Sequence, residues 1–343
     1  MFIETGQTAA AGALVDPLTG GPPDLHGVYT HLCRVEIDLL RGDLEAAQRR
    51  LGQVRAMTAG LAGGFRGQDY APFLAAELAL WTGRPGEALA EITSALHALS
   101  LPIMSTAGGL LMLGMRACAD LAETARARRD EAAQADALAA AADLESWVDR
   151  LEVRPFTDHP PDMYPPAERA TWQAERARLT GDSDQAAWAG AAKTWADMGR
   201  VHRAAYARWR QAQALLGAGH PATAAAPALR AAATEATGHT PLLAQVRALA
   251  ERARIDLTGP AAGGAAAAVT REPDRHGLTG RELSVLRLLA RGRTNAQIGA
   301  ELYMSPKTAS VHVSSIFRKL GVSGRAQAAA VAERAGLLDD PRP

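Results

Sequence analysis

The sequence predicts an all-α protein in two parts, an array of helical hairpins followed by a short unit of four helices. Three observations support this. Residues 25–257 are rich in alanine and leucine, and their apolar residues recur at helical spacing. Glycine-containing turns recur through this stretch at intervals near forty residues. Residues 277–338 contain short apolar-periodic segments separated by residues that cap helices.

Each hairpin of the first part joins an apolar helix to an alanine-rich helix through a short turn. Gly42 and Gly83 are 41 residues apart, and the 98 residues from Gly83 to Gly181 leave room for two units, with a turn near Arg129-Asp130. A further interval of 38 residues leads to the glycine at position 219. Because one hairpin cannot bury its own apolar face, neighbouring hairpins must stack. We therefore expect a tetratricopeptide-like helical-hairpin solenoid.

A segment rich in alanine, glycine and proline follows the hairpins and carries no core-forming pattern, so we expect a flexible linker. The predicted organisation is an N-terminal tail at 1–24, the helical repeat domain at 25–257, the linker at 258–276, a C-terminal domain at 277–338 and a short tail at 339–343.

Cap and stop residues divide the C-terminal domain into four short helices. Hydroxyl residues suited to begin a helix alternate with glycines suited to end one, and a proline takes the first position of the third helix. The signals in order are the capping-box pair Thr279 and Glu282, Gly292, the second pair Thr294 and Gln297, Ser305 with Pro306, Gly321, and a fourth helix from about Arg325 to Ala335.

The third of these helices has two faces. One face is an apolar stripe that should pack on the first two helices. The other is polar and basic, and is free to enter a DNA major groove, which is wide enough for an α-helix. The apolar stripe is Ala309, Val313, Ile316 and Leu320; the opposite face is Lys307, Ser310, Val311, Ser314 and Arg318.

Charge is distributed unevenly along the chain. Acidic and basic residues balance overall, at 37 each. Between Leu278 and Leu338, however, nine basic residues stand against three acidic ones. A basic C-terminal end fits a DNA-binding unit.

These residues closely resemble the LuxR-type helix-turn-helix domain over about the last sixty positions. The resemblance implies a four-helix unit whose third helix reads DNA and whose fourth commonly supports a dimer contact. It implies base reading by Ser310, Val311 and Ser314, and DNA-backbone contacts by Lys307, Thr308, Lys319 and Arg325. The matching residues are Leu278-Thr279, Glu282, Leu286, Leu289, Gly292, Asn295, Ile298, Leu302, Ser305, Lys307-Thr308, Val311-His312, Ile316, Lys319-Leu320 and Arg325. The full set of expected DNA-binding residues is Thr294, Asn295, Lys307, Thr308, Ser310, Val311, Ser314, Arg318, Lys319 and Arg325.

The hairpins followed by this domain look like the C-terminal part of the large ATP-binding LuxR regulators, the MalT-like group, without their ATPase module. A P-loop needs glycine directly before its lysine. The chain's lysines, Lys193, Lys307 and Lys319, follow alanine, proline and arginine. We therefore expect no enzyme activity, cofactor or catalytic residue. Either a natural short form or a fragment of a longer regulator would fit.

Other candidates for chemistry are weak. Cys33 and Cys118 lack metal-ligand spacing, which favours reduced core thiols, and we expect no metal. The segment from Asp158 to Asp162 favours a proline-rich loop over a metal or acid-base site. No segment favours a membrane span. Four tryptophans at helical spacing could line a ligand groove, but core packing is favoured: Trp172, Trp188, Trp195 and Trp209.

The sequence thus predicts a cytoplasmic, nucleoid-associated transcription regulator. Expected partners are double-stranded DNA, a second copy on that DNA, and a protein or small-molecule ligand on the repeats, with RNA polymerase as a further candidate. One rival is a protein-interaction module that DNA merely tethers. Another is an ATP-dependent switch, which the missing P-loop opposes. The operator and the direction of regulation are open.

Overall fold

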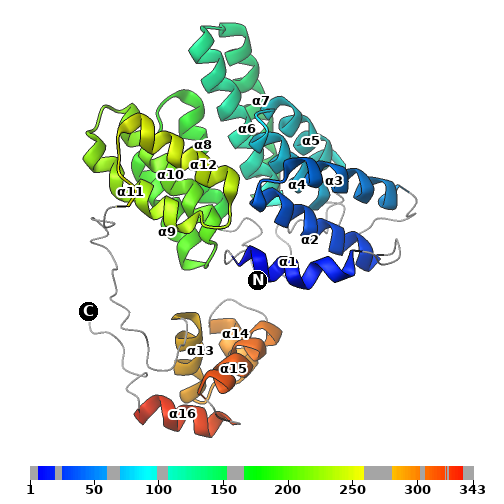
Figure 1. Ribbon diagram of the computed structural model, residues 1–343, viewed down its shortest axis with the longest axis vertical. Helices are drawn as coiled ribbons and strands as arrows, with labels where there is room; N and C mark the ends of the chain where they lie inside the picture. The colour runs from blue at the N-terminus through cyan, green and yellow to red at the C-terminus, as the bar shows by residue number, and fades with distance from the viewer. Residues whose placement is uncertain are drawn as a thin grey trace. The chain divides into compact units, whose positions relative to one another are not determined.

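The computed structural model of the chain is helical throughout the part it describes and divides into two compact units, Met1–Gly263 and Gly264–Pro343 (Figure 1). The division falls within the segment assigned to the linker. The structure describes residues 7–19, 25–59, 70–98, 107–152, 166–258, 280–301, 306–320, 322 and 324–334.

Unit 1 consists of helices that pair in sequence order, with short turns inside each pair (Figure 1). The helices are α1 (Thr8–Val15), α2 (Leu25–Arg41), α3 (Leu44–Thr58), α4 (Tyr70–Trp81), α5 (Pro85–Ala98), α6 (Ala107–Arg128), α7 (Glu131–Glu152), α8 (Pro166–Thr180), α9 (Gln185–Asp197), α10 (Val201–Gly217), α11 (Ala222–Glu235) and α12 (Thr240–Ala253), with a 3-10 turn, η1, at Asp16–Leu18.

The turns inside the pairs lie where the sequence predicts them. At the first, Gly42 has φ +82°, its N–H donates to the Leu39 carbonyl at 3.1 Å, and the Asp43 N–H donates to the Asp38 carbonyl at 2.9 Å. This is the glycine-dependent end of an α-helix. Arg129 takes the same left-handed position between α6 and α7, with φ +58°. The other predicted turn glycines also have positive φ: Gly83, Gly181 and Gly219.

Helix α1 lies in the stretch expected to be an N-terminal tail, so that description is corrected to include a helix. The Arg41 side chain of α2 donates to the Thr8 carbonyl at 3.5 Å, and Arg34 of α2 pairs with Asp16 of η1. Ala11 is buried against α2. The sequence analysis missed this helix because the contacts that hold it come from α2.

The tryptophans and cysteines occupy interior positions. Trp188 and Trp209 are buried in one core cluster, and Trp195 is buried in a second cluster against which Trp172 is partly buried. All four therefore pack in the core, as the sequence favours, and Trp195 also lines a cavity. Cys118 is fully buried and Cys33 half-buried. The segment from Asp158 to Asp162 lies outside the described residues. No described helix is both long and apolar enough to cross a bilayer.

Unit 2 is a small bundle with its own apolar core. Helices α13 and α15 pack on each other and on α16, and α14 packs on α15. The core is made by α13, α14, α15 and α16 together. The helices are α13 (Gly280–Ala290), α14 (Asn295–Glu301), α15 (Pro306–Leu320) and α16 (Arg325–Arg334).

The helical pairs of unit 1 curve so that the first and last meet. Successive contacts join α2 to α4, α4 to α6, and α6 to α8, while α12 contacts both α10 and α2. A Cβ placed on Gly42 would lie 3.2 Å from the Cβ of Thr240. The His239 ring stands edge-on to the Trp81 ring, with centroids 4.9 Å apart. The pairs therefore surround a shared interior.

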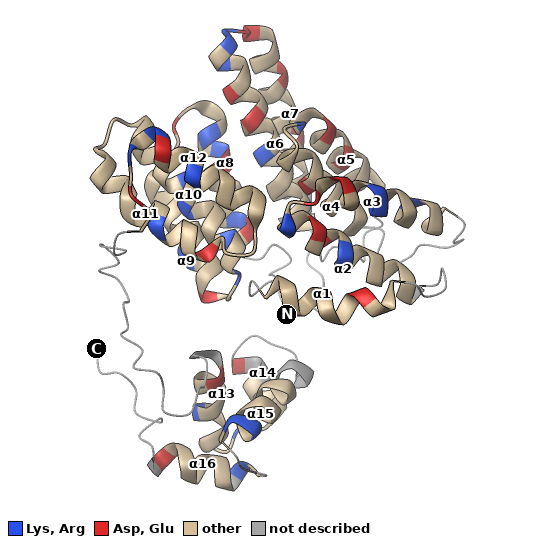
Figure 2. Ribbon diagram, in the orientation of Figure 1, with Lys and Arg blue, Asp and Glu red and all other residues tan. Residues whose placement is uncertain are grey.

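A buried ion network links α6, α8 and α10 on one side of that interior. Arg178 of α8 is 3% exposed and donates to Asp120 of α6 at 2.7 Å and to Glu175 at 2.7 Å. Arg210 of α10 donates to the same Asp120 oxygen at 2.9 Å. In Figure 2, by contrast, many charged residues lie scattered over the helices of unit 1 rather than gathered in one cluster.

The Asp120 carboxylate is held ionised in the folded chain. Burial alone would raise its pKa, but the guanidinium groups of Arg178, Arg210 and Arg116 outweigh burial and lower the pKa from 3.8 to about 2. A lowered pKa means that ionised Asp120 stabilises the fold fully above the ordinary pKa of 3.8, and that this stabilisation is lost as the pH falls toward 2.

We expect Asp120→Asn to lower the free energy of unfolding of unit 1 by about 3 kcal/mol at neutral pH, because two buried guanidinium groups lose their shared counter-charge. Urea unfolding followed by tryptophan fluorescence measures this, since the tryptophans all lie in unit 1. Asp197→Asn is the matched control. Asp197 pairs with Lys193 on the surface, so its loss should change stability by less than about 1 kcal/mol. Equal effects of the two variants would contradict the role assigned to Asp120.

Candidate nucleic-acid interface

Helix α15 has the two faces that the sequence predicts. Ala309, Val313 and Ile316 are buried in the core of unit 2. On the opposite side, Val311 is 54% exposed. The neighbouring side chains Ser310, Ser314 and Arg318 are exposed too. Unit 2 therefore presents one contiguous helix face to solvent.

This exposed face carries groups suited to a DNA groove. The Ser314 hydroxyl donates to the Ser310 carbonyl one turn earlier, at 3.0 Å, so its oxygen lone pairs stay available to accept. The Ser310 hydroxyl can donate or accept, and the Val311 methyl groups can pack on a thymine methyl. A guanidinium such as that of Arg318 suits phosphate. The face thus combines groups for base edges with a cation for the DNA backbone.

A buried carboxylate fixes α15 on α13. Glu282 of α13 is 5% exposed and accepts hydrogen bonds from the Ser315 hydroxyl at 2.7 Å and the Lys319 ammonium at 2.7 Å. Lys319, expected to contact the DNA backbone, therefore forms an ion pair within unit 2. Its contact with DNA stays a prediction, whereas its role in holding α15 is seen directly.

The start of α14 confirms the second capping box. The Gln297 N–H donates to the Thr294 hydroxyl at 3.3 Å, and the Thr294 N–H donates to the Gln297 side chain at 2.9 Å. Gly292, with φ +78°, ends α13 as predicted. These two signals set the turn between α13 and α14.

Arg325, at the start of α16, anchors that turn. Its guanidinium donates to the Arg293 carbonyl at 2.8 Å and to the Asn295 side-chain oxygen. Asn295, expected among the DNA-binding residues, and Arg325, expected at the DNA backbone, thus bind each other. Both α15 and α16 carry basic residues (Figure 2).

For several residues singled out in the sequence, the side chain lies outside the part of the chain that the structure describes. Lys307 and Thr308 belong to the first turn of α15, but their side chains lie outside the described residues, as do Thr279 and Ser305. Sequence reasoning did not find the clamp at Glu282, which it treated as a helix cap. The partners of Glu282 lie 33 and 37 residues further along the chain, and no local pattern marks them.

Comparison with known proteins places this interface in a known group. Residues 276–332 match the family described as bacterial regulatory proteins, luxR family. The chain is 44% identical over 62 residues to the spore germination protein GerE of Bacillus subtilis, which covers 18% of this chain and 84% of GerE. It is 48% identical over 62 residues to the transcriptional regulatory protein LiaR of Bacillus subtilis, and equally to the probable transcriptional regulatory protein NarL of Mycobacterium tuberculosis.

The similarity is confined to the C-terminal part of the chain. The matched residues make up 18% of this chain and 29% of the length of LiaR and of NarL. No solved structure matches the chain. Unit 1 is therefore interpreted from its own residues.

We expect Glu282→Gln to destabilise unit 2 by about 2 kcal/mol, because the Lys319 ammonium and the Ser315 hydroxyl lose a charged acceptor in a buried place. Amide hydrogen exchange in α13 and α15, read by mass spectrometry, reports on this unit alone. Glu301→Gln is the matched control. Glu301 pairs with Arg293 at 2.7 Å with both side chains well exposed, and its loss should change protection by less than about 1 kcal/mol. A Glu282 variant as well protected as the control would show that the clamp does not hold α15.

Proposed function

Because this chain belongs to the luxR family of bacterial regulatory proteins, we propose that it is a sequence-specific transcription regulator whose α15 reads the DNA major groove. The observation that carries the proposal is the exposed face of α15, where Ser310, Val311 and Ser314 lie side by side while the buried face of the same helix is fixed to the core. Action on the chromosome places the protein in the cytoplasm, at the nucleoid.

The proposed contacts fall into three groups. Ser310, Val311 and Ser314 read base edges. Arg318, with Lys307, Thr308 and Thr294, contacts phosphates and sets the position of the helix. Asn295, Lys319 and Arg325 act first through the fold, because each already binds a partner within unit 2; a shift of these side chains on binding would add phosphate contacts.

We propose that unit 1 is a tetratricopeptide-like solenoid that receives the signal. Its successive helical pairs and its curvature round a shared interior support this proposal. A small molecule or a protein bound there would alter DNA binding by a second copy of the chain, or contact with RNA polymerase. Two copies on DNA would read half-sites about 34–36 Å apart or a multiple of that spacing.

Two rival functions differ in measurable ways. If DNA only tethers an interaction module, a ligand of unit 1 leaves DNA affinity unchanged. If the chain is an ATP-dependent switch, calorimetry with ATP and magnesium gives a stoichiometric signal. The absence of glycine before any of the lysines Lys193, Lys307 and Lys319 favours the regulator over the switch.

The decisive experiment is selection of bound fragments from random DNA by the purified full chain. We expect one enriched motif made of two related half-sites with fixed spacing. Retention of fragments without an enriched motif would contradict sequence-specific reading.

For the reading face, we expect Ser310→Ala and Val311→Ala to change base preference at one or two positions of the selected site, by about 1–3 kcal/mol per affected base pair. Each side chain is exposed on α15, so its loss should leave the fold intact. Affinities for single-base operator variants at one fixed salt concentration measure the effect. An unchanged rank order of sites for both variants would remove them from the reading face.

For the phosphate contact, we expect Arg318→Ala to weaken all sites about equally and to reduce the slope of log affinity against log salt by about one unit. The measurement is a salt titration on the selected site and on one unrelated sequence. Lys193→Ala, a change at an exposed cation on α9 of unit 1, is the control and should leave the slope unchanged. A change of rank order among sites in the Arg318 variant would assign this residue to base reading instead.

A further inference from the structure

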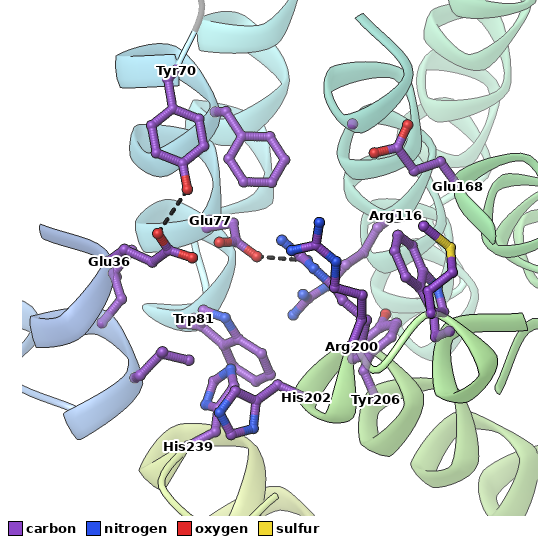
Figure 3. Close-up of a pocket in the computed structure, with 17 residues that line it drawn as sticks. Glu36, Tyr70, Glu77, Trp81, Arg116, Glu168, Arg200, His202, Tyr206 and His239 are labelled. Carbon is purple, nitrogen blue, oxygen red and sulfur yellow. Dashed lines mark hydrogen bonds and ion pairs between the residues drawn. The ribbon is translucent and has the colours of Figure 1, made fainter. Parts of the chain in front are cut away.

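The interior of unit 1 contains a cavity of about 390 Å³, within the size range of small-molecule sites. Aromatic rings from several helices line it, together with both acidic and basic side chains (Figure 3). The rings come from α4, α9 and α10: Tyr70, Phe73, Trp81, Trp195 and Tyr206.

Arg116 of α6 is a buried and poorly paired cation in this lining. It is 6% exposed, and its guanidinium carbon lies 4.5 Å from the Trp81 ring centroid and 4.6 Å from that of Tyr206. Its Nε has no hydrogen-bond partner among the described residues. The nearest carboxylate, Asp120, is 3.8 Å away and is shared by Arg178 and Arg210.

Among the other basic groups of the lining, Arg203 is paired with an acid and the two histidines are uncharged. Arg203 pairs with Glu77 at 2.7 Å. Burial lowers the pKa of His202 and of His239, and the nearby guanidinium groups lower it further, so both rings are neutral at neutral pH. The cavity therefore holds a desolvated Arg116 beside neutral imidazoles, and the partly buried Arg200 is a further cation of the lining (Figure 3).

The acids of the lining are not counter-ions of Arg116 either. Glu36 accepts the Tyr70 hydroxyl at 2.8 Å (Figure 3), and burial raises its pKa. Glu168 Oε2 is buried without a hydrogen-bond partner in the described part of the chain. Burial raises the pKa of Glu168 to about 7, although Arg203 opposes this. At neutral pH, Glu168 is thus protonated in about half of the molecules, and in that form it can donate a hydrogen bond.

We propose that this cavity binds a small organic carboxylate with a flat apolar body, whose carboxylate pairs with the edge of Arg116. The Trp81 and Tyr206 rings each lie against the guanidinium of Arg116, and a carboxylate matches the N–H edge of a guanidinium through paired hydrogen bonds. The aromatic walls suit a planar body, and Glu168 can donate to a second polar group. An amine would meet Arg116 as a like charge, whereas Arg203 is already paired with Glu77.

The cavity also lies between several helical pairs, so a bound ligand could change how these pairs are arranged. Trp81 belongs to α4, Arg116 to α6 and Tyr206 to α10, so one bound molecule would touch three helical pairs. That this ligand is the regulatory signal rests on the function proposed above, whereas the carboxylate site itself does not.

The experiment titrates the full chain with matched probes and follows calorimetry and tryptophan fluorescence. The probes are benzoate, 3-phenylpropionate and indole-3-acetate, each with its neutral amide, and 3-phenylpropylamine. We expect at least one carboxylate to bind about tenfold or more tightly than its own amide, and the amine not to bind. If no carboxylate of the panel binds more tightly than its amide, the proposal is wrong.

Arg116→Met tests whether the preference for carboxylate over amide depends on Arg116. Methionine is suited to this test because it retains an unbranched apolar chain between the two rings. We expect this variant to lose the preference for carboxylate over amide. Arg176→Met is the matched control at a surface pair with Glu145 and should retain the preference. If Arg116→Met does not fold, the probe ratios of the unchanged chain decide the question. Retained preference in a folded Arg116→Met protein would overturn the assignment.

A separate measurement of affinity for the selected DNA, with and without the bound carboxylate, tests the signalling role. A shift in affinity supports both proposals. Binding of the carboxylate without a shift supports the cavity site and contradicts its role as the signal.

Discussion

The arrangement of unit 1 depends most on the ion pairs that the Asp120 carboxylate forms with Arg178 and Arg210. One oxygen accepts from Arg178 of α8 and from Arg210 of α10, while the residue itself sits on α6. Two guanidinium groups buried from water are compensated there by this anion together with Glu175 and Glu123, which also bind Arg178. Apolar packing alone would bring the alanine-rich helices together. It would not fix their relative position, because short alanine side chains interlock little with those of a neighbouring helix. The ion network supplies directional contacts that fix which helical pairs face one another.

The same network explains why the interior holds an unsatisfied cation. The oxygen of Asp120 that could have served Arg116 lies 3.8 Å from its Nε, and the other is taken by Arg178 and Arg210. Arg116 is therefore stabilised by two ring faces and only weakly by Asp120, a distant counter-ion that it shares with Arg178 and Arg210. A structure optimised for stability alone would replace such a group with an apolar one, because a desolvated charge without a partner is costly. Arg116 lines the same cavity as Glu168, whose pKa burial raises to about 7, and this connects the architecture of unit 1 with the ligand site proposed above.

Unit 2 solves a related problem on a smaller scale. The helix proposed to read DNA, α15, must be held firmly on one side and left exposed on the other. Glu282 holds the C-terminal half of α15 through Ser315 and Lys319, and Arg325 holds the start of α14. Both contacts recruit polar or basic residues that the sequence alone would assign to DNA. These contacts hold α15 and α14 in position. Ser310, Val311, Ser314 and Arg318 are not needed for that and stay exposed.

The sequence by itself determined the features that depend on near neighbours. Gly42 and Gly292 end their helices because left-handed backbone suits glycine, Thr294 and Gln297 cap α14 because they stand three residues apart, and α15 is two-faced because its apolar residues follow the helical period. Only the tertiary structure decided which long-range partners the charged residues take. Asp120 and Arg210 are 90 residues apart, and Glu282 and Lys319 are 37 apart, so no local pattern encodes either pair. The short helix α1 escaped prediction for the same reason, since its stabilising contacts come from Arg34 and Arg41 of another helix. Helical periodicity reports what a segment does with its own neighbours, whereas the cavity around Arg116 exists only once distant helices have packed.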